Sequence, residues 1–229
     1  DNNANPVPTE ADYSTAGVMG VTSANLMEVN AAIDAAVATE ADTAAEIQAI
    51  VDQVNADLAM AAAIDKIEAY ADNNANPVPT EADYSTAGVT DVTAANLAEV
   101  NMAIDAAVAT EADTAIEIQA IVDQVITDLA TAAAISKIDT YADDQTNAPT
   151  TTDYATAGVN DVTDANRDRV NAAIAALATG EADTAAKIQA IVDQVNEDIA
   201  TENAINTIEA YADNNTNTVP AEADYSTAG

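Results

Sequence analysis

The sequence has no cysteine and no histidine, and its only aromatic residues are seven tyrosines. Without cysteine the chain forms no disulfide bonds, and it offers neither thiolate metal ligands nor a thiol nucleophile. Without histidine it lacks the usual general base that activates a serine nucleophile, and it has no glycine-rich phosphate-binding motif. These absences predict that the chain is not an enzyme.

Basic residues are also scarce. Five lysines and arginines stand against 40 aspartates and glutamates, which gives a formal net charge of -35. Nucleic acids are bound by basic surfaces that neutralise phosphates, and anionic membranes repel a surface of this sign. We therefore expect neither as a partner. An acidic surface of this kind keeps a long protein soluble, and it suits high ionic strength and divalent cations.

Long apolar runs are missing as well. No run approaches the roughly 18–20 apolar residues that cross a bilayer, so we predict no membrane insertion in this segment. Apolar residues nevertheless make up 49% of the chain, with alanine the most frequent. This composition provides enough material for thin cores between closely packed helices.

The sequence is repetitive, with a period of about seventy residues. The segment 1–71 recurs as 72–142 and as 143–212, and the start of a fourth copy occupies 213–229. We take these four segments as the units of organisation. Because the chain begins and ends in the same phase of the repeat, we expect it to belong to a longer repetitive protein. Arrays of this kind usually serve as structural or binding scaffolds.

Each complete repeat contains a predicted amphipathic helix. In the first copy, Thr22 is the expected N-cap, and the apolar residues that follow it recur at steps of three and four. These residues are Leu26, Val29, Ile33 and Val37. Such spacing places them on one face of a helix.

A much longer helix follows in each repeat. Thr43 and Glu46 have the spacing of a capping box, and neither glycine nor proline interrupts the chain from Thr43 to Ala71. We therefore predict one continuous helix, about 43 Å long at 1.5 Å per residue. Its apolar stripe drifts around the helix after Leu58. That drift is expected if the first half packs in one bundle and the second half in the next.

A polar loop and a short helix connect one repeat to the next. In the second repeat the loop spans 72–79, the short helix 80–84, and Gly88 is the expected residue that ends it. We find no period-two pattern that would indicate strands. The predicted fold is all-α: tandem three-helix-bundle repeats joined by long shared helices into a rod or filament.

Three stretches of each repeat resemble a known family. In the second repeat, 87–89 reads AGV, 92–101 reads VTAANLAEVN and 115–123 reads AIEIQAIVD. These stretches resemble the GA-like three-helix modules that occur in tandem in large bacterial surface and adhesin proteins. The resemblance implies a three-helix fold and an extracellular location. Some modules of this class bind serum albumin, and others are spacers.

The polar loops are candidate calcium sites. Calcium takes six to eight oxygen ligands, and known loops supply them from positions 1, 3, 5 and 12, among others. The same positions hold Asp or Asn in three loops: Asp1, Asn3, Asn5 and Asp12; Asp72, Asn74, Asn76 and Asp83; Asp213, Asn215, Asn217 and Asp224. The alternative interpretation is a turn rich in Asn, Asp and Pro that ends one helix and begins the next.

Two further features allow two interpretations each. Glu40, Asp42 and Glu46 are either capping charges at a helix N-terminus or a second cation site. The tyrosines recur at two phases, before the end of each long helix and within each short helix. We expect their rings to pack between helices with the hydroxyl groups at the surface, and the alternative is a stacking platform for sugars.

The features together predict a structural segment of an extracellular, cell-surface stalk, adhesin or filament. Its partners would be adjacent repeats or neighbouring copies of itself. The first alternative is a repeated, albumin-binding-like module that gains affinity through avidity. The second is a stalk whose rigidity is controlled by calcium. The sequence leaves open whether a single-chain stalk or a multi-chain filament is formed.

Overall fold

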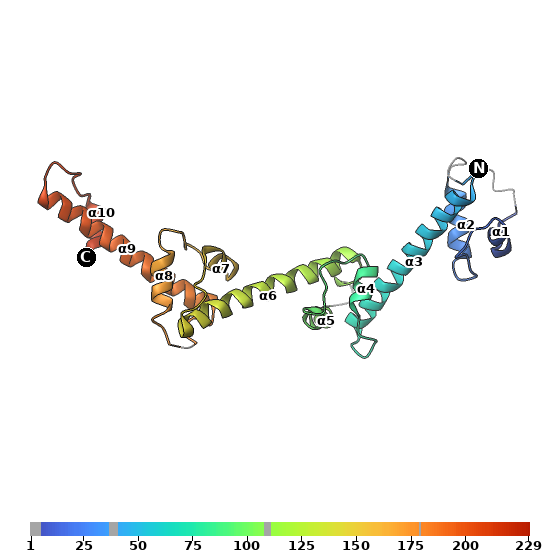
Figure 1. Cartoon of the computed structure of the whole chain (residues 1–229), viewed down its shortest axis with the longest axis horizontal. Helices are drawn as coiled ribbons and strands as arrows, with labels where there is room; N and C mark the ends of the chain where they lie inside the picture. Colours follow the sequence, from blue (N-terminus) through green and yellow to red (C-terminus); the bar gives the residue numbers. More distant parts are fainter. Residues whose placement is uncertain (1–5, 37–40, 108–110, 179) are drawn as a thin grey trace. The chain divides into compact units, whose positions relative to one another are not determined.

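The computed structural model describes residues 6–36, 41–107, 111–178 and 180–229 (Figure 1). Over these residues the chain is all-helical and contains no strand, which confirms the predicted all-α class. The helices are α1 (Glu10–Thr15), α2 (Leu26–Ala35), α3 (Ala44–Asp72), α4 (Glu81–Thr86), α5 (Leu97–Ala106), α6 (Ala115–Asp144), α7 (Thr151–Thr156), α8 (Arg167–Ile174), α9 (Ala185–Asp213) and α10 (Glu222–Ala228).

The chain divides into two compact units. Unit 1 is Asp1–Val125 and unit 2 is Ile126–Gly229. The division falls within α6, so each half of this helix is described with the unit to which it belongs.

The long helices form where the sequence predicts them. The first, α3, has 29 residues and begins after Thr43, whose hydroxyl accepts the Glu46 N–H at 3.3 Å. The Glu46 carboxylate accepts the Thr43 N–H at 3.0 Å, which completes the capping box. In α9 the glutamate is replaced by Lys187, and Thr184 still caps the helix. The threonine is therefore sufficient to start the helix.

The start of the first helix differs from the prediction. The N-cap of α2 is Asn25 and not Thr22, so the helix begins at Leu26. The Asn25 side chain accepts the Thr22 N–H at 2.7 Å and donates to the Gly20 carbonyl at 2.8 Å. These bonds close residues 22–25 into a turn ahead of the helix. Val37, the last residue of the predicted stripe, lies outside the described residues.

The short helices end as the sequence predicts. Gly88 follows α4 with φ of +81°, a conformation that glycine adopts without a steric cost. Its N–H bonds to the Ser85 carbonyl at 3.1 Å, and the Val89 N–H bonds to the Tyr84 carbonyl at 2.9 Å. This pair of bonds is the Schellman arrangement, which satisfies carbonyl groups at a helix end.

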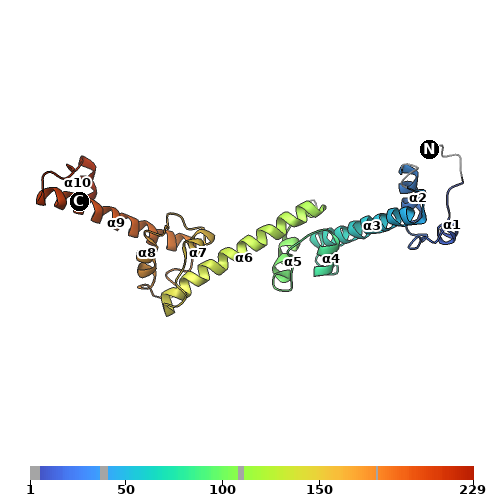
Figure 2. The ribbon, with the colours of Figure 1, turned by 45° about the horizontal axis from the view of Figure 1, so that its top comes forward.

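In unit 1, α3 packs against different helices along its length (Figures 1 and 2). Its first half contributes Val51 to a buried cluster with Tyr13, Val18 and Val29 from α1, α2 and the segment between them. Its second half contacts α4 and α5. The residues buried along this second half are Ala63, Ile67, Tyr70 and Ala71. Between the two halves, Leu58 and Met60 are 37% and 40% exposed.

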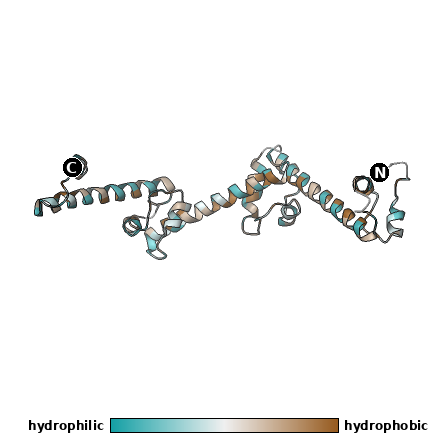
Figure 3. Cartoon of the chain, turned by 90° about the horizontal axis from the view of Figure 1, so that it is seen from above, coloured by the Kyte–Doolittle hydropathy of each residue, from teal (hydrophilic) through white to brown (hydrophobic). Residues whose placement is uncertain are grey.

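In unit 2, one core joins the second half of α6 to α7, α8 and the first half of α9. Its buried residues are Ala134, Ile138, Ala142, Tyr154, Ala157, Val159, Val170, Ile174, Ala182, Ile188, Val192 and Val195. The second half of α9 contacts α10, whose Tyr225 is 54% exposed, whereas Tyr154 of α7 is fully buried. Apolar and polar residues are interleaved along the long helices (Figure 3), so each helix presents both a packing face and a solvated face.

Helix α6 is long and apolar enough, by length and composition alone, to cross a membrane. Core helices that are mostly buried pass the same test, whereas 17% of the most apolar window of α6 is buried. Ile118 and Val122 of α6 are buried in unit 1, and Ile138 is buried in unit 2.

The core of unit 2 yields the first prediction. Ile138→Ala removes buried methyl groups and leaves a cavity, so we expect the free energy of unfolding to fall by about 2–5 kcal/mol. Ile116 lies on the same helix but is 83% exposed, and Ile116→Ala serves as the matched control with an expected change within about 0.5 kcal/mol. Urea denaturation followed by circular dichroism measures both, and equal effects would contradict the assigned core.

Candidate functional site

A hydrogen-bond relay fastens each of the short helices α1, α4 and α7 to the helix that follows it. In the second repeat the Tyr84 hydroxyl donates to Asn101 Oδ1 at 2.7 Å, and Asn101 Nδ2 donates to the Pro79 carbonyl at 3.0 Å. Both side chains are buried. We call this relay the Tyr–Asn clamp. It contradicts the expected placement of the Tyr13, Tyr84 and Tyr154 hydroxyls at the surface, because each of them donates to an asparagine of the next helix. Tyr225, the fourth tyrosine of this set, is 54% exposed.

The Tyr–Asn clamp occurs in all three complete repeats. Its other members are Tyr13 with Asn30 and the Pro8 carbonyl, and Tyr154 with Asn171 and the Pro149 carbonyl, with hydroxyl–amide distances of 2.6 Å in both. Burial raises the pKa of Tyr84 and of Tyr154, so both hydroxyl groups keep their protons and act as donors. The signal in the sequence was an asparagine inside an apolar stripe that recurs in step with the tyrosine.

An ion pair joins the long helix to the short helix at two junctions. Lys66 Nζ lies 2.5 Å from Asp83 Oδ2, and Lys137 Nζ lies 2.6 Å from Asp153 Oδ2. Asp83 also accepts the Thr80 N–H at 2.7 Å and so caps α4. At the third junction the corresponding residues are Thr207 and Asp224, so this ion pair is missing there.

The ion pair changes the titration of its carboxylate. Partial burial alone would raise the pKa of Asp83, but the hydrogen bonds from Lys66 and Thr80 outweigh it and hold the pKa below its ordinary value. Because the folded pKa is the lower one, this pairing stabilises the fold above the unfolded pKa of about 3.9. The contribution is lost as the pH falls through the folded pKa. Asp153 behaves in the same way with Lys137 and Thr150.

A glutamine near the start of each long helix binds the backbone of the segment that connects the short helix to the helix after it. Gln48 Oε1 accepts the Met19 N–H at 2.7 Å, and Gln48 Nε2 donates to the Met19 carbonyl at 3.0 Å. Gln119 and Gln189 accept the N–H groups of Thr90 and Asn160 in the same way. No sequence pattern pointed to this glutamine, which lies beside an apolar stripe and carries no charge.

The candidate calcium loops place their side chains in capping roles. In the loop after α3, Asn76 Nδ2 donates to the Ala69 carbonyl at 2.6 Å, and Asn74 Nδ2 lies 3.2 Å from an Asp105 oxygen. Asp72 is the last residue of α3, and Asp83 caps α4. These contacts use two amide nitrogens and one capping carboxylate, as in the alternative interpretation of a turn between two helices.

The loop after α9 follows the same pattern. Asn217 Nδ2 donates to the Ala210 carbonyl at 2.6 Å, and Asp224 accepts the Ala221 N–H. Asp213 ends α9, and Asn215 lies in the loop after it. Asp12 accepts the Thr9 N–H in α1, and Asp1, Asn3 and Asn5 lie outside the described residues. Within the described part of the chain, no three carboxylates converge in a way that would hold a metal ion, and calcium binding stays a prediction.

The acidic cluster at the start of α3 has a capping role for Glu46. A hydrogen bond between the carboxyl groups of Asp42 and Glu46, together with the repulsion between their charges, raises the pKa of Asp42. Bonds from Thr43 and from Asp42 lower the pKa of Glu46. In the third repeat, Lys187 replaces the glutamate and lies 2.7 Å from Asp183. Glu40 lies outside the described residues, so the three-carboxylate cation site stays a prediction.

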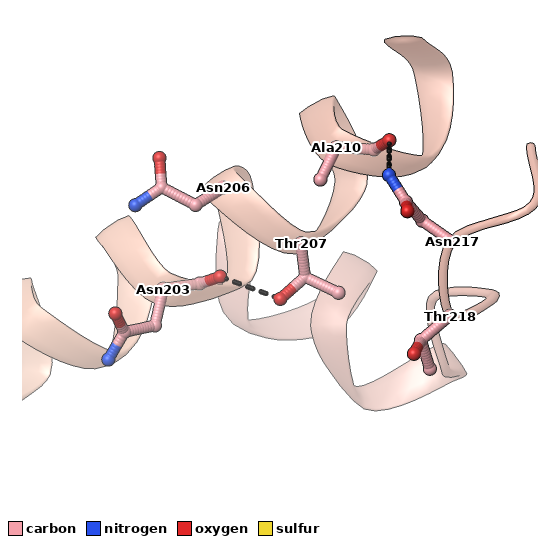
Figure 4. A pocket seen from close by; sticks show the side chains of 6 residues that line it. All are labelled: Asn203, Asn206, Thr207, Ala210, Asn217 and Thr218. Atoms are coloured by element: carbon pink, nitrogen blue, oxygen red, sulfur yellow. Dashed lines mark hydrogen bonds between the residues drawn. The ribbon is translucent and has the colours of Figure 1, made fainter. Parts of the chain in front are cut away.

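An open polar hollow lies beside the second half of α9 (Figure 4). It has a volume of about 650 Å³ and is lined by Asn203, Asn206, Thr207, Ala210, Asn217 and Thr218. Two of its polar groups bond to backbone, Asn217 to Ala210 and Thr207 to Asn203. Its lining consists of amides, hydroxyls and a methyl group, none of which serves as a general acid or base near neutral pH.

A scan against protein-family models finds no match, and searches of the curated proteins and of the solved structures find none either. The functional argument therefore depends on the contacts within the chain. The recurrent polar groups described above bind other parts of the same chain, and they do so at the junctions between helices.

The Tyr–Asn clamp yields the second prediction. Asn101→Ala leaves the buried Tyr84 hydroxyl without its acceptor, so we expect a loss of about 1–3 kcal/mol in the free energy of unfolding. Tyr84→Phe removes the donor and should also destabilise the protein. Tyr225→Phe is the matched control, because the Tyr225 side chain is half exposed and we expect no measurable change. If the clamp did not contribute to stability, all three variants would have the same free energy of unfolding as the parent protein in urea denaturation.

The candidate calcium loops yield the third prediction. A ligand at one hundred times its dissociation constant stabilises the folded state by about 2.7 kcal/mol. If the loops bind calcium, the Tm in calcium chloride will exceed the Tm in chelator. Replacing Asp72 and Asn74 by alanine, with similar changes in the other loops, would abolish the difference. Magnesium chloride at the same ionic strength is the control, and an unchanged midpoint with calcium excludes the site.

Proposed function

We propose that this chain is a structural segment of an extracellular surface stalk, adhesin or filament. In this proposal, successive three-helix bundles are joined by long helices that each belong to two bundles. The function is mechanical. The long helices set the spacing between bundles, and the acidic surface keeps neighbouring stretches of the protein apart and in solution.

The proposal depends most on how α3 is buried, because its two halves pack against different helices. Its first half is buried with α1 and α2 through Val51, and its second half is buried with α4 and α5 through Ile67. The side chains between these halves, including Leu58, are exposed. A helix without glycine or proline that is anchored in two cores acts as a stiff connection, unlike a flexible linker.

The polar chemistry of the chain supports the same proposal. The clamp tyrosine and asparagine and the helix-start glutamine of the three complete repeats are engaged in contacts within the chain, as at Tyr84 and Gln48. The lysine of two repeats, as at Lys66, is engaged in the same way. The same contacts recur along the chain, which is the arrangement of a repetitive scaffold. The excess of negative charge favours an extracellular, solvated surface.

The mechanical proposal is tested by lengthening the chain. A series with one, two and three additional copies of residues 72–142 is measured by small-angle X-ray scattering. A rod of bundles joined by continuous helices should gain a similar length with each copy, of the order of the 43 Å that 29 helical residues span. A compact protein would instead grow roughly as the 0.38 power of its length.

A matched series interrupts the long helices. Inserting Gly-Pro-Gly after Leu58, and at the same phase in each added copy, breaks the helix in its exposed middle. The bundles should stay folded by circular dichroism, while the length gained per copy should fall. Equal gains with and without the insertion would overturn the proposal. Labelling of intact producing cells with an antibody against the chain tests the surface location.

A further inference from the structure

The loop after α9 carries a motif that the other polar loops lack. Residues 214–216 read NNT, and no other asparagine of the sequence has a serine or threonine two positions after it. An asparagine followed by any residue except proline, and then by serine or threonine, is the acceptor motif for N-linked saccharides. The middle residue here is Asn215, which meets this requirement.

The structure brings the two reactive groups of the motif together. The Thr216 hydroxyl donates to Asn214 Oδ1 at 2.9 Å, and the Thr216 N–H donates to the same oxygen at 3.1 Å. The second of these bonds makes an Asx turn. Both bonds use the carbonyl oxygen of the amide, so neither occupies Nδ2, the atom to which a saccharide is attached. An enzyme that recognises the amide and the hydroxyl therefore finds both on one turn.

The turn is exposed and fastened to the end of α9. Asn214, Asn215 and Thr216 are all exposed, and Asn214 has an extended backbone conformation where the helix ends. The Asn217 N–H bonds to the Asn214 carbonyl at 2.9 Å. Asn217 Nδ2 donates to the Ala210 carbonyl at 2.6 Å (Figure 4). The acceptor thus lies outside the helix, on a short turn that is anchored at its far side.

The equivalent turns after α3 and α6 are exposed as well, although further helices of the bundle follow each of them. Asn73 and Ala75 are exposed after α3, and Asp144 and Thr146 are exposed after α6. The exposure of this turn is therefore a property of the loop in each repeat.

Each of those two turns lacks one chemical group of the motif. After α3, Asn73 Oδ1 accepts the Ala75 N–H at 3.1 Å, but alanine has no hydroxyl. After α6, the N–H and the hydroxyl of Thr146 donate to the Asp144 carboxylate, both at 2.8 Å, but a carboxylate has no amide nitrogen. The chain thus contains two matched turns in which the acceptor is incomplete.

We propose that Asn214 accepts an N-linked saccharide while the chain is exported. The glycosyl donor is a saccharide linked through diphosphate to a polyprenol. Asn214 Nδ2 forms a bond to C1 of the first sugar, and the bond between C1 and the diphosphate oxygen breaks. The polyprenyl diphosphate leaves with the electron pair of that bond, and a base of the transferase takes one proton from Nδ2.

This inference rests on the extracellular location in the proposed function, because the transfer occurs on the side of the membrane to which proteins are exported. A saccharide at this turn adds a bulky, hydrated group to the surface. That addition agrees with a protein whose acidic surface keeps neighbouring stretches apart and in solution.

The proposal is tested by secreting the full chain, behind a cleavable signal sequence, from cultured eukaryotic cells that carry out N-glycosylation. We expect an intact mass that exceeds the mass of the polypeptide by one saccharide. Peptide-N-glycosidase should remove the excess and leave aspartate at position 214, as read by peptide mass spectrometry. A glycoprotein reporter secreted by the same cells confirms that the transferase is active. The same chain without the signal sequence should stay unmodified.

Substitutions within the three turns identify the acceptor. Asn214→Gln removes the acceptor and keeps an amide, and Thr216→Ala removes the hydroxyl, so both should abolish the mass increase. Thr218→Ala is the matched control, because Thr218 lies in the same loop outside the motif, and it should change nothing. Ala75→Thr and Asp144→Asn complete the motif in the other two turns, and each should add one saccharide. Circular dichroism confirms that every variant remains helical.

An unmodified Asn214 in the secreted chain, while the reporter is glycosylated, would overturn the proposal. An undiminished mass increase in Asn214→Gln would do the same. Neither result bears on the surface location, because the signal sequence is supplied. Native protein that is labelled on intact producing cells but is unmodified at Asn214 would reject the saccharide and retain the surface stalk. Native protein that is modified but not labelled would reject the surface location and retain the acceptor.

Discussion

The fold depends on burying the two halves of an uninterrupted helix in different places. Helices of this length gain most of their stability in proteins from packing an apolar face, because intrinsic propensity contributes little. In α3 the buried side chains of the first half, such as Val51, and of the second half, such as Ile67, contact different partners. The short helices and capped turns supply those partners.

Small side chains make the cores thin, and polar contacts then define how the helices meet. Alanine and valine are tolerant of small shifts in helix position, whereas a buried hydroxyl and amide are satisfied in one arrangement only. Tyr84, Asn101 and the Pro79 carbonyl form such an arrangement in the second repeat. The recurrence of this clamp explains how helices of low complexity can pack in one register.

Local signals predicted the helices well because capping is a local interaction. Thr43 and Glu46 are three residues apart, and the backbone between them decides whether both capping bonds form. The predicted start of α2 was wrong because the Asn25 side chain bonds to Thr22 and Gly20, and both Asn and Thr are good capping residues.

The predicted position of the clamp tyrosine hydroxyls was wrong because their acceptors lie 17 residues away, on another helix. For the polar loops, Asx spacing is compatible with either capping or cation binding, and Asn76 and Asp83 have capping contacts in the structure.

The sequence by itself determined the helical class, the period of the repeat, the ends of the long helices and the excess of negative charge. Each of these depends on neighbours within a few residues or on composition alone. Only the tertiary structure decided which face of each long helix is covered and which polar groups pair across helices. These features depend on contacts between segments that are far apart in the chain.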